Sequence, residues 1–361
     1  MIVMFNEQII KDKDTWNEII EGFTSKDVYF IYNYFVPYAN KKNGKPVLYY
    51  FECDYGKIAH TFMLRDIANS NNFKGVLEVN KYFDIISAYG YGGPLVESDT
   101  MGNKEKLIEE FEKRFSLYCK ENNIISEFVR FHPILKNYLG FENLYNPIYL
   151  RKTLATNLQD YGDPLYGEFT KSCRKTVNRC KRRGMTVEFD FTGKTLDAFY
   201  KIYNSTMDRN DALDFYYFDL DYFESLIGNL KDNIFIANVI YEDKIVASGI
   251  YMHYEKYIHA HLSGTLSDYL KYSPANILKA EVADWGYKNG KHYFHHGGGY
   301  TNSEEDGLYR FKKSFSKNTS FNYYVGKKIW NQELYQSLTD KAREQFSDID
   351  ENFFPAYRFV K

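Results

Sequence analysis

The sequence predicts an α/β (α+β) protein of two domains, in which mixed sheets are flanked by helices. Three observations lead to this prediction. The chain has 361 residues, which is the usual length of about two domains. Hydrophobic residues make up 44% of it, so packed cores are feasible and a disordered chain is excluded. The two halves repeat one coarse order of helices and strands, although the sequence itself does not repeat.

Helices are expected where apolar residues recur at spacings of three and four. Segments of this kind cover residues 13–23, 103–121, 169–183, 195–210, 222–230, 274–288, 308–315 and 333–346. Pro274 suits a first helical turn, because the N–H that it lacks would have no partner there. Gly290 suits the left-handed cap that ends the same helix.

Strands are expected where aromatic and β-branched runs are bounded by turn residues. Such runs cover residues 28–35, 47–52, 56–64, 127–131, 234–239, 244–254, 256–264 and 319–330, with a short one from Tyr293. We place the join between the domains at 153–164. This gives an N-terminal domain over 1–155 and a C-terminal domain over 156–330. Residues 331–361 form a C-terminal helix and tail that we expect to pack back on the N-terminal domain.

Charge and cysteine content limit the compartment and the partners. The formal net charge is −2, so a nucleic acid would need a local basic patch. None of the four cysteines lies in a CxxC motif or at zinc-ligand spacing, so no metal site is expected. Cys173 and Cys180 lie seven apart on an expected helix, too far for a disulfide. Free thiols, no signal peptide and no long apolar run predict a cytoplasmic location.

The most informative stretch covers residues 273–315. It contains Ser-Pro-Ala-Asn, Trp-Gly-Tyr, a Gly-Gly pair and then Gly-Leu-Tyr-Arg-Phe-Lys-Lys-Ser-Phe. This pattern resembles the second domain of the Fem-type peptidyltransferases, which are tandem relatives of the GNAT acyltransferases. The matching residues are Pro274, Asn276, Trp285, Gly286, Tyr287, Gly298, Gly299, Gly307, Leu308, Tyr309, Arg310, Phe311, Lys312, Lys313 and Phe315. The resemblance implies two GNAT-like domains in tandem, without the coiled-coil arm of some members.

The resemblance also implies roles for single residues. Lys312 matches a lysine near the transfer centre, where a fixed cation could stabilise an oxyanion or pair with a donor phosphate. Arg209 matches an arginine near the phosphates of the acceptor. The segment Tyr89-Gly-Tyr-Gly-Gly-Pro94 resembles the first domain, and its glycines fit either a ligand or a bent strand. The expected substrate-binding residues are Arg209, Tyr89, Tyr91, Gly92, Gly93, Arg130, Phe311, Gly298 and Tyr309.

Two histidines complete the expected catalytic set with Lys312. His296 follows His295 at the glycine-rich strand end, where a neutral imidazole could accept a proton from the attacking amine or simply bond the backbone. His132 follows Arg130 where many Fem-type proteins have an aspartate after Arg-x, so it is the second candidate base. No Ser/His/Asp or Cys/His order is present, so a covalent intermediate is not indicated.

One expected helix carries a basic face. Lys171, Arg174, Lys175, Arg179 and Arg182 step by three and four, which places them on one side. Such a face is either solvated or binds an anion, and tRNA is the polyanion that the family resemblance implies.

The segment before the expected central helix indicates which acyl donor the protein uses. CoA-dependent GNAT enzymes have a glycine-rich pyrophosphate cradle there, whereas this chain has Leu270-Lys-Tyr-Ser-Pro-Ala275. The expected function is therefore transfer of an amino acid from aminoacyl-tRNA to an amine of a peptidoglycan precursor, without a tightly bound cofactor. Peripheral contact with a lipid-linked substrate is compatible with this function. Two alternatives stay open: an acyl-CoA-dependent N-acyltransferase on a small molecule or sugar amine, and an inactive glycan- or peptide-binding protein.

Overall fold

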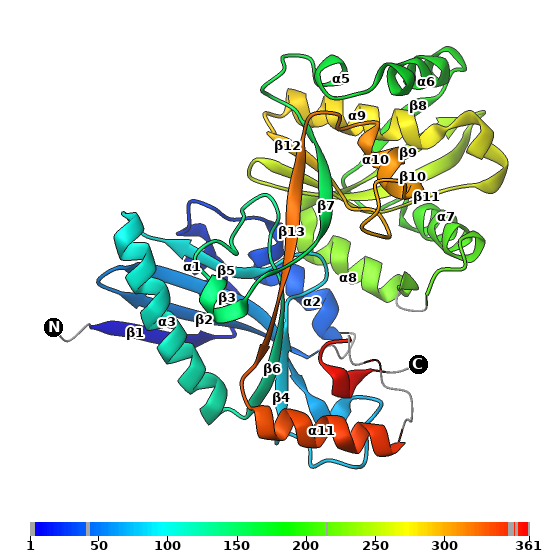
Figure 1. Ribbon diagram of the computed structural model, residues 1–361. Coiled ribbons are helices and arrows are strands. Elements are labelled where there is room, and N and C mark those ends of the chain that lie inside the picture. Colours follow the sequence, from blue (N-terminus) through cyan, green and yellow to red (C-terminus); the bar gives the residue numbers. More distant parts are fainter. Residues whose placement is uncertain (1–3, 41–43, 214–215, 346–349, 351–352, 360–361) are drawn as a thin grey trace. The chain divides into compact units, whose positions relative to one another are not determined.

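The computed structural model describes residues 4–40, 44–213, 216–345, 350 and 353–359. Lys41 and Lys42, basic residues of the first domain that could assist the site, lie outside this part. The chain divides into two compact units: Met1–Leu150 with Tyr323–Lys361, and Arg151–Asn322 (Figure 1). The sequence predicts the boundary between the two domains at 155/156. It predicts that the segment packing back on the first domain begins at residue 331. No helix among the described residues is long and apolar enough to cross a membrane.

The first unit is built on a mixed sheet. Its strands are β1 (Phe5–Ile10), β2 (Lys45–Cys53), β3 (Gly56–Asp66), β4 (Phe83–Ile86), β5 (Gly93–Glu97), β6 (Ile124–Arg130) and β13 (Ser320–Ile329), the last from Tyr323 onward. The order is β1-β2-β3-β4-β6-β13, and β5 pairs with β3. β4 and β6 are parallel, and the other neighbours are antiparallel. β3 pairs with β5 along its first half and with β4 along its second half, so the sheet divides there.

Helices bury the apolar residues of this unit. They are α1 (Lys13–Glu21), η1 (Val28–Phe30), α2 (Tyr32–Asn40), η2 (Ile67–Asn69), α3 (Met101–Glu121), α4 (Glu142–Tyr145), α11 (Gln332–Gln345) and η6 (Ala356–Arg358). The side chain of Thr100 caps α3, which then buries Leu107, Phe111 and Phe115 at steps of four against β2 and β3. This helix confirms the periodicity seen in the sequence.

The strand predicted over 28–35 is wrong, because this segment forms η1 and the start of α2. Aromatic and β-branched residues favour strands locally, which explains the prediction. In the structure, Asp27 caps η1, and Tyr34, Phe35 and Tyr38 are all buried at helical spacing. Burial of these large rings outweighs their strand propensity, since most helical stability comes from packing.

The strands of the second unit follow the order β7-β12-β11-β10-β9-β8. The strands are β7 (Ile148–Asn157, from Arg151 onward), β8 (Thr186–Asp190), β9 (Ile234–Tyr241), β10 (Lys244–Tyr254), β11 (Tyr257–Thr265) and β12 (Tyr293–Gly297). The expected domain join at 153–164 therefore begins inside a strand. β11 and β12 run parallel but pair only from Tyr257–Tyr293 to His259–His295. Beyond this point the two strands diverge, which is the arrangement expected of a GNAT-like sheet.

Helices cover both faces of this sheet. They are α5 (Pro164–Gly167), α6 (Lys171–Arg182), α7 (Leu196–Arg209), α8 (Leu220–Leu230), η4 (Lys231–Asn233), η5 (Ser267–Tyr272), α9 (Pro274–Lys288) and α10 (Gly307–Lys313). Figure 1 shows α6 and α9 on one face and α7 and α8 on the other. Pro274 occupies the first turn of α9, and Gly290 has a φ of 67°, so both predicted ends of this helix are confirmed.

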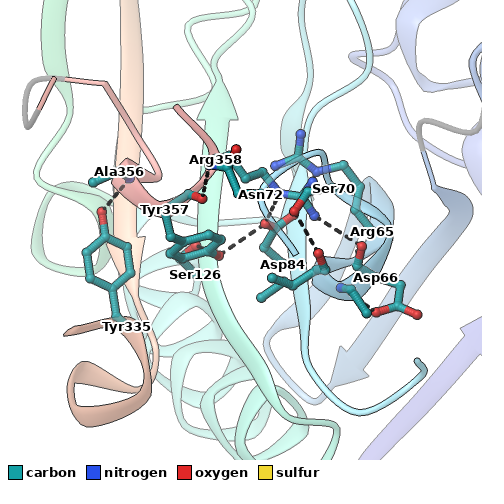
Figure 2. Close-up of polar contacts among 12 residues, drawn as sticks. Arg65, Asp66, Ser70, Asn72, Asp84, Ser126, Tyr335, Ala356, Tyr357 and Arg358 are labelled. Carbon is teal, nitrogen blue, oxygen red and sulfur yellow. Dashed lines mark hydrogen bonds and ion pairs between the residues drawn. The ribbon is translucent and has the colours of Figure 1, made fainter. Parts of the chain in front are cut away.

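The C-terminal segment is anchored to the first unit by a buried carboxylate (Figure 2). Asp84 accepts hydrogen bonds from Arg65 Nε at 2.7 Å, from Tyr357 Oη at 3.0 Å, and from Arg358 Nε. Asn72 donates to the carbonyls of Tyr357 at 2.9 Å and Phe359 at 2.8 Å. Burial raises the pKa of Asp84, but Arg358 and Arg65 outweigh it and hold this pKa below its usual value. The network fixes the tail as part of the first unit.

Candidate active site

Close backbone packing at the end of β12 explains the glycine-rich segment. A Cβ atom on Gly298 would lie 2.9 Å from Arg151 Cδ and 3.0 Å from the Lys152 carbonyl oxygen. A Cβ on Gly299 would lie 2.9 Å from the Asp306 carboxylate carbon. Only glycine allows this approach to β7 and α10 without displacing one of them. The segment thus brings backbone carbonyls within reach of side chains from both elements.

Lys312 is bound at this strand end. The side chain of Asp306 caps α10 by accepting from the Tyr309 amide at 2.9 Å, which sets the direction of this short helix. Lys312 Nζ donates to the Gly298 carbonyl at 2.6 Å. Burial lowers the pKa of Lys312 to about 8, and the positive charge of Arg151 adds to this effect while Asp306 opposes it. The ammonium is therefore held in a fixed position and is still mostly charged at neutral pH.

Arg151 supports the segment that follows. Its Nη1 donates to the carbonyls of Gly299 at 2.7 Å and Tyr300 at 3.0 Å. Two cations from different elements, Lys312 and Arg151, thus bind successive carbonyls of the glycine-rich segment. Lys312 was expected from the family motif, but no pattern marked Arg151.

His296 lies behind this segment in a single tautomer. Thr156 Oγ1 donates its only hydrogen to the Phe315 carbonyl at 2.8 Å, so it must accept from His296 Nε2–H, which lies 2.9 Å away. The Nδ1 atom is then an acceptor, and Lys279 Nζ donates to it at 3.3 Å. Burial lowers the pKa of His296 well below its usual value, and the charges of Lys279, His295 and Lys312 lower it further. Because both ring nitrogens are occupied, His296 is poorly suited to accept a substrate proton near pH 7.

Lys279 was not predicted from the sequence. It lies on α9 with 7% of its surface exposed, and its Nζ lies over the rings of Phe294 and Phe315 at 5.3 and 5.8 Å. Burial lowers its pKa from 10.5 to about 7, and the charge of Lys312 lowers it further. One signal was present in the sequence: position 279 shares a helix face with Val282, Ala283 and Gly286, where a charge is unexpected.

A cavity of about 450 Å³ adjoins these residues in the second unit. Its lining is Lys152, Thr170, Glu304, Glu305, Tyr309, Arg310, Lys313, Ser314 and Ser320. Three cations, two glutamates and four hydroxyl groups line it, and Glu304 and Glu305 form ion pairs with Lys152 and Arg310. Thr170 caps α6, so the cavity meets the start of the basic helix. Its size and polarity suit a charged, hydrogen-bonding ligand better than an apolar one.

The basic face of α6 forms as the sequence predicts, with Cys173, Val177 and Cys180 buried on the opposite side. Lys171, Lys175, Arg179 and Arg182 are exposed. Arg174 differs, because its guanidinium donates to the Phe169 carbonyl and lies over the ring of Tyr166. Four of the five predicted cations are therefore available to a partner in solution.

Other predicted residues of the second unit have structural contacts. Arg209 ends α7 and donates to the Thr265 carbonyl at 2.9 Å and to Ser267 Oγ at 3.1 Å, while its side chain stays exposed. Phe311 packs on Phe315 with ring centroids 5.1 Å apart, which leaves it only half-buried. Tyr309 is buried. Gly298, Tyr309, Phe311 and Lys312 thus come together at α10, whereas Arg209 belongs to the end of α7.

The predicted residues of the first unit surround its glycine-rich segment. His132 Nδ1 accepts from the Leu135 amide at 3.2 Å, and Nε2 lies 2.9 Å from Asp27 Oδ2. Asn137 accepts from the His132 amide at 2.7 Å and donates to the Gly92 carbonyl at 2.8 Å. These bonds support a positioning role for His132 better than a role as base.

The remaining predicted residues of this unit lie within the glycine-rich segment 89–94 or beside it. Arg130 donates to the Ser87 carbonyl at 3.2 Å. Tyr34 donates to the Tyr89 carbonyl at 2.5 Å, and Tyr29 lies edge-on to Tyr91 with centroids 5.2 Å apart. Gly93 has a φ of 88°, a conformation that favours glycine. The segment is thus fixed by tyrosines and by the turn after β6.

Comparison with known proteins agrees with this geometry. An acetyltransferase (GNAT) domain model matches residues 167–313. The chain is 24% identical over 320 residues to the UDP-N-acetylmuramoylpentapeptide-lysine N(6)-alanyltransferase of Weissella viridescens, covering 82% of this chain and 88% of that protein. The structure of FemX matches at a TM-score of 0.66 and 14% identity, over 93% of this chain and 99% of that one. L-PGS from Bacillus licheniformis matches at 0.54 and 15%, over 92% and 96%.

The fold, the diverging strands β11 and β12, and the GNAT match define an acyltransferase with two GNAT-like domains in tandem. Within this class the chain is similar to the Fem-type peptidyltransferases. The comparisons bear out the family resemblance of residues 273–315 and the predicted fold class.

Proposed function

We propose that the protein transfers an amino acid from aminoacyl-tRNA to an amine of a peptidoglycan precursor. The observation that carries this proposal is Lys312, whose ammonium is fixed on the Gly298 carbonyl beside the GNAT-like strand end. The similarity to an alanyltransferase that acts on a muramoylpentapeptide lysine supports this class of acceptor. The proposed location is the cytoplasm, where both aminoacyl-tRNA and nucleotide-linked precursors are present.

Lys312 has the chemistry that acyl transfer requires. Attack of an amine on an ester carbonyl places negative charge on the carbonyl oxygen, and a fixed cation stabilises this charge without reorganisation. The reaction also needs the acyl group and the amine to be held together. Gly298, Tyr309 and Phe311 are proposed to hold the donor beside Lys312, and Arg209 is proposed to bind acceptor phosphate through its exposed guanidinium.

Features at the start of α9 support an aminoacyl-tRNA donor over acyl-CoA. Ser273 has a φ of 60° and Pro274 follows it in the first helical turn. Proline has no N–H, so one of the amides that would bind pyrophosphate at this helix start is missing. The exposed cations of α6 and the cavity beside α10 offer sites for the phosphates and the 3′ end of a tRNA. Peripheral contact with a lipid-linked acceptor remains compatible with these features.

A donor competition tests the proposal. The protein is incubated with UDP-linked muramoyl-pentapeptide and either a charged mixture of aminoacyl-tRNAs or radiolabelled acetyl-CoA, and products are resolved by mass. We expect the precursor to gain the mass of one amino acid, and only in the presence of charged tRNA. Acetylation without aminoacyl transfer would replace the proposal by a CoA-dependent N-acyltransferase. Tight precursor binding without either product would indicate an inactive binding protein.

A further inference from the structure

Lys279 is a charged residue in a position that an apolar one would occupy at lower cost. Its neighbours along α9 are the buried residues Ile277, Leu278 and Ala280. No carboxylate among the described residues forms an ion pair with it. Desolvation of an unpaired amine opposes folding, so a methionine at this position would stabilise the protein. A residue that costs stability and contacts the candidate active site is a candidate for a role in function.

The contacts of Lys279 connect it to Lys312 through one strand. Its Nζ donates to His296 Nδ1, and the other side of that ring is fixed by Thr156. His296 precedes Gly297 and Gly298, and the Gly298 carbonyl holds Lys312 Nζ at 2.6 Å. Loss of the Lys279 amine would leave His296 Nδ1 without its donor. The imidazole could then change tautomer or rotate, and the strand end that carries Gly298 would lose one of its restraints.

Charge provides a second connection between the two lysines. The groups that face the Lys279 amine are His296 from β12, Lys312 from α10 and Cys173 from α6. The charge of Lys312 lowers the pKa of Lys279 beyond the effect of burial. Lys279, with a pKa of about 7, loses its proton before Lys312, with a pKa of about 8. Near neutral pH the shared positive charge therefore resides mainly on Lys312.

We propose that Lys279 is a positioning residue of this active site, which holds Lys312 in place through His296 and the Gly298 strand end. The proposal rests on the proposed function, because it assigns Lys312 to the transfer step. Lys279 itself acts through these neighbours and takes no part in bond formation.

Lys279→Met tests the proposal, because methionine keeps the length and the apolar stem of the side chain. Lys288→Met is the matched control: it lies on the same helix, exposed, in an ion pair with Asp284 at 2.6 Å. We expect Lys279→Met to melt at a higher temperature than the wild type at pH 7, and to lower kcat by roughly tenfold or more with little change in KM. Lys288→Met should leave kcat and KM unchanged. A kcat within about twofold of the wild type would refute the positioning role.

A measurement without substrate separates this proposal from the proposed function. NMR of histidine rings labelled with 15N, with His296→Gln used for assignment, reports the tautomer of His296. The wild type should show one tautomer with its proton on Nε2, and Lys279→Met should shift the Nδ1 resonance or show a mixture of tautomers, because Nδ1 has lost its donor. If the wild type transfers no aminoacyl group from any donor, the proposed function fails, and this spectrum still decides the inference. An unchanged His296 spectrum would overturn it.

A double-mutant cycle shows whether Lys279 acts through the imidazole. Thr156→Val removes the acceptor that fixes His296 Nε2–H. If both residues hold the same ring, the combined variant should lose little more activity than Lys279→Met alone. Additive losses would mean that Lys279 acts independently of His296, contrary to the proposal.

Discussion

Lys312 is the residue on which the proposed transfer chemistry depends. Lys312→Ala should lower transfer by about 10²-fold, the scale of a lost oxyanion donor, without unfolding the protein. Activity of the wild type should fall as pH rises through about 8, because a lysine loses its charge above its pKa. Lys312→Arg stays charged over this range, so its remaining activity should lack the alkaline decrease. The measurement is the pH dependence of kcat.

The adjacent Lys313 is the comparison for this experiment. Its Nζ donates to the Lys317 carbonyl at 3.1 Å instead of the glycine-rich segment. Lys313→Ala should therefore cost much less than Lys312→Ala. Full activity in Lys312→Ala together with inactivity in Lys313→Ala would show that the motif had been assigned to the wrong lysine.

The buried charge of Lys279 gives stability a pH dependence. Its pKa is about 7 in the folded protein and 10.5 ordinarily, so between these values the unfolded chain binds a proton that the folded chain does not. Stability should therefore rise with pH across this window, relative to Lys279→Met. The advantage of Lys279→Met should be on the order of 4 kcal/mol near pH 7 and should shrink toward pH 10. Urea unfolding of both proteins at several pH values measures this, and a constant difference would contradict it.

At the scale of secondary structure, variants of α6 test whether the donor is aminoacyl-tRNA or acyl-CoA. Reversal of Lys171, Lys175 and Arg179 to glutamate should weaken tRNA binding and reduce its salt dependence. Each lost phosphate contact should lower the slope of log affinity against log salt by roughly 0.7–0.9. Arg174 is left intact because its contacts with Phe169 and Tyr166 support the fold.

A control with the same change in net charge lies on α3 of the first unit. Lys106, Lys113 and Lys120 are exposed there, and their reversal to glutamate should leave tRNA binding nearly unchanged. Equal loss from both triple variants would mean that only the overall charge matters. If both triple variants bind acetyl-CoA as the wild type does, and no tRNA binds at all, the small-molecule donor is favoured.

At the scale of the whole molecule, the chain returns to its first unit and is fixed there by its C-terminal segment (Figure 2). Arg358→Met removes one of the two arginines that pair with the buried Asp84 and leaves Arg65 and the Tyr357 hydroxyl, so it should destabilise the protein by about 2–4 kcal/mol. Arg343→Met breaks an exposed pair with Asp340 and should cost less than about 1 kcal/mol. Urea denaturation compares the two variants, and equal effects would contradict the role assigned to the buried network.

The pH dependence of this network has a defined sign. The pKa of Asp84 is lowered in the folded state, so its contribution is present above the ordinary aspartate value and is lost as pH falls through the folded value. The difference in stability between the wild type and Arg358→Met should therefore become smaller in acid. A difference that grows as pH falls would contradict this assignment.

Local sequence determined the parts of this protein whose signals are short-range. The bounds of α9, the basic face of α6 and the identity of the 307–313 helix follow from periodicity, proline, glycine and capping residues. The glycine-rich segment at 297–299 was also visible, together with the lysine that binds it. These features depend on neighbours within a few positions. The role expected of Lys312 came instead from the family resemblance of residues 273–315.

Only the tertiary structure decided the rest, because the deciding contacts join distant positions. Residues 28–35 became helical since burial of their rings outweighed strand propensity. Thr156 fixed the tautomer of His296 from 140 positions away, and this left Lys279 as the buried amine behind Lys312. Asp84 pairs with Arg358, which lies 274 positions further along the chain. A lowered pKa or a fixed tautomer arises from desolvation and from the partners that folding supplies, and neither quantity exists in the sequence alone.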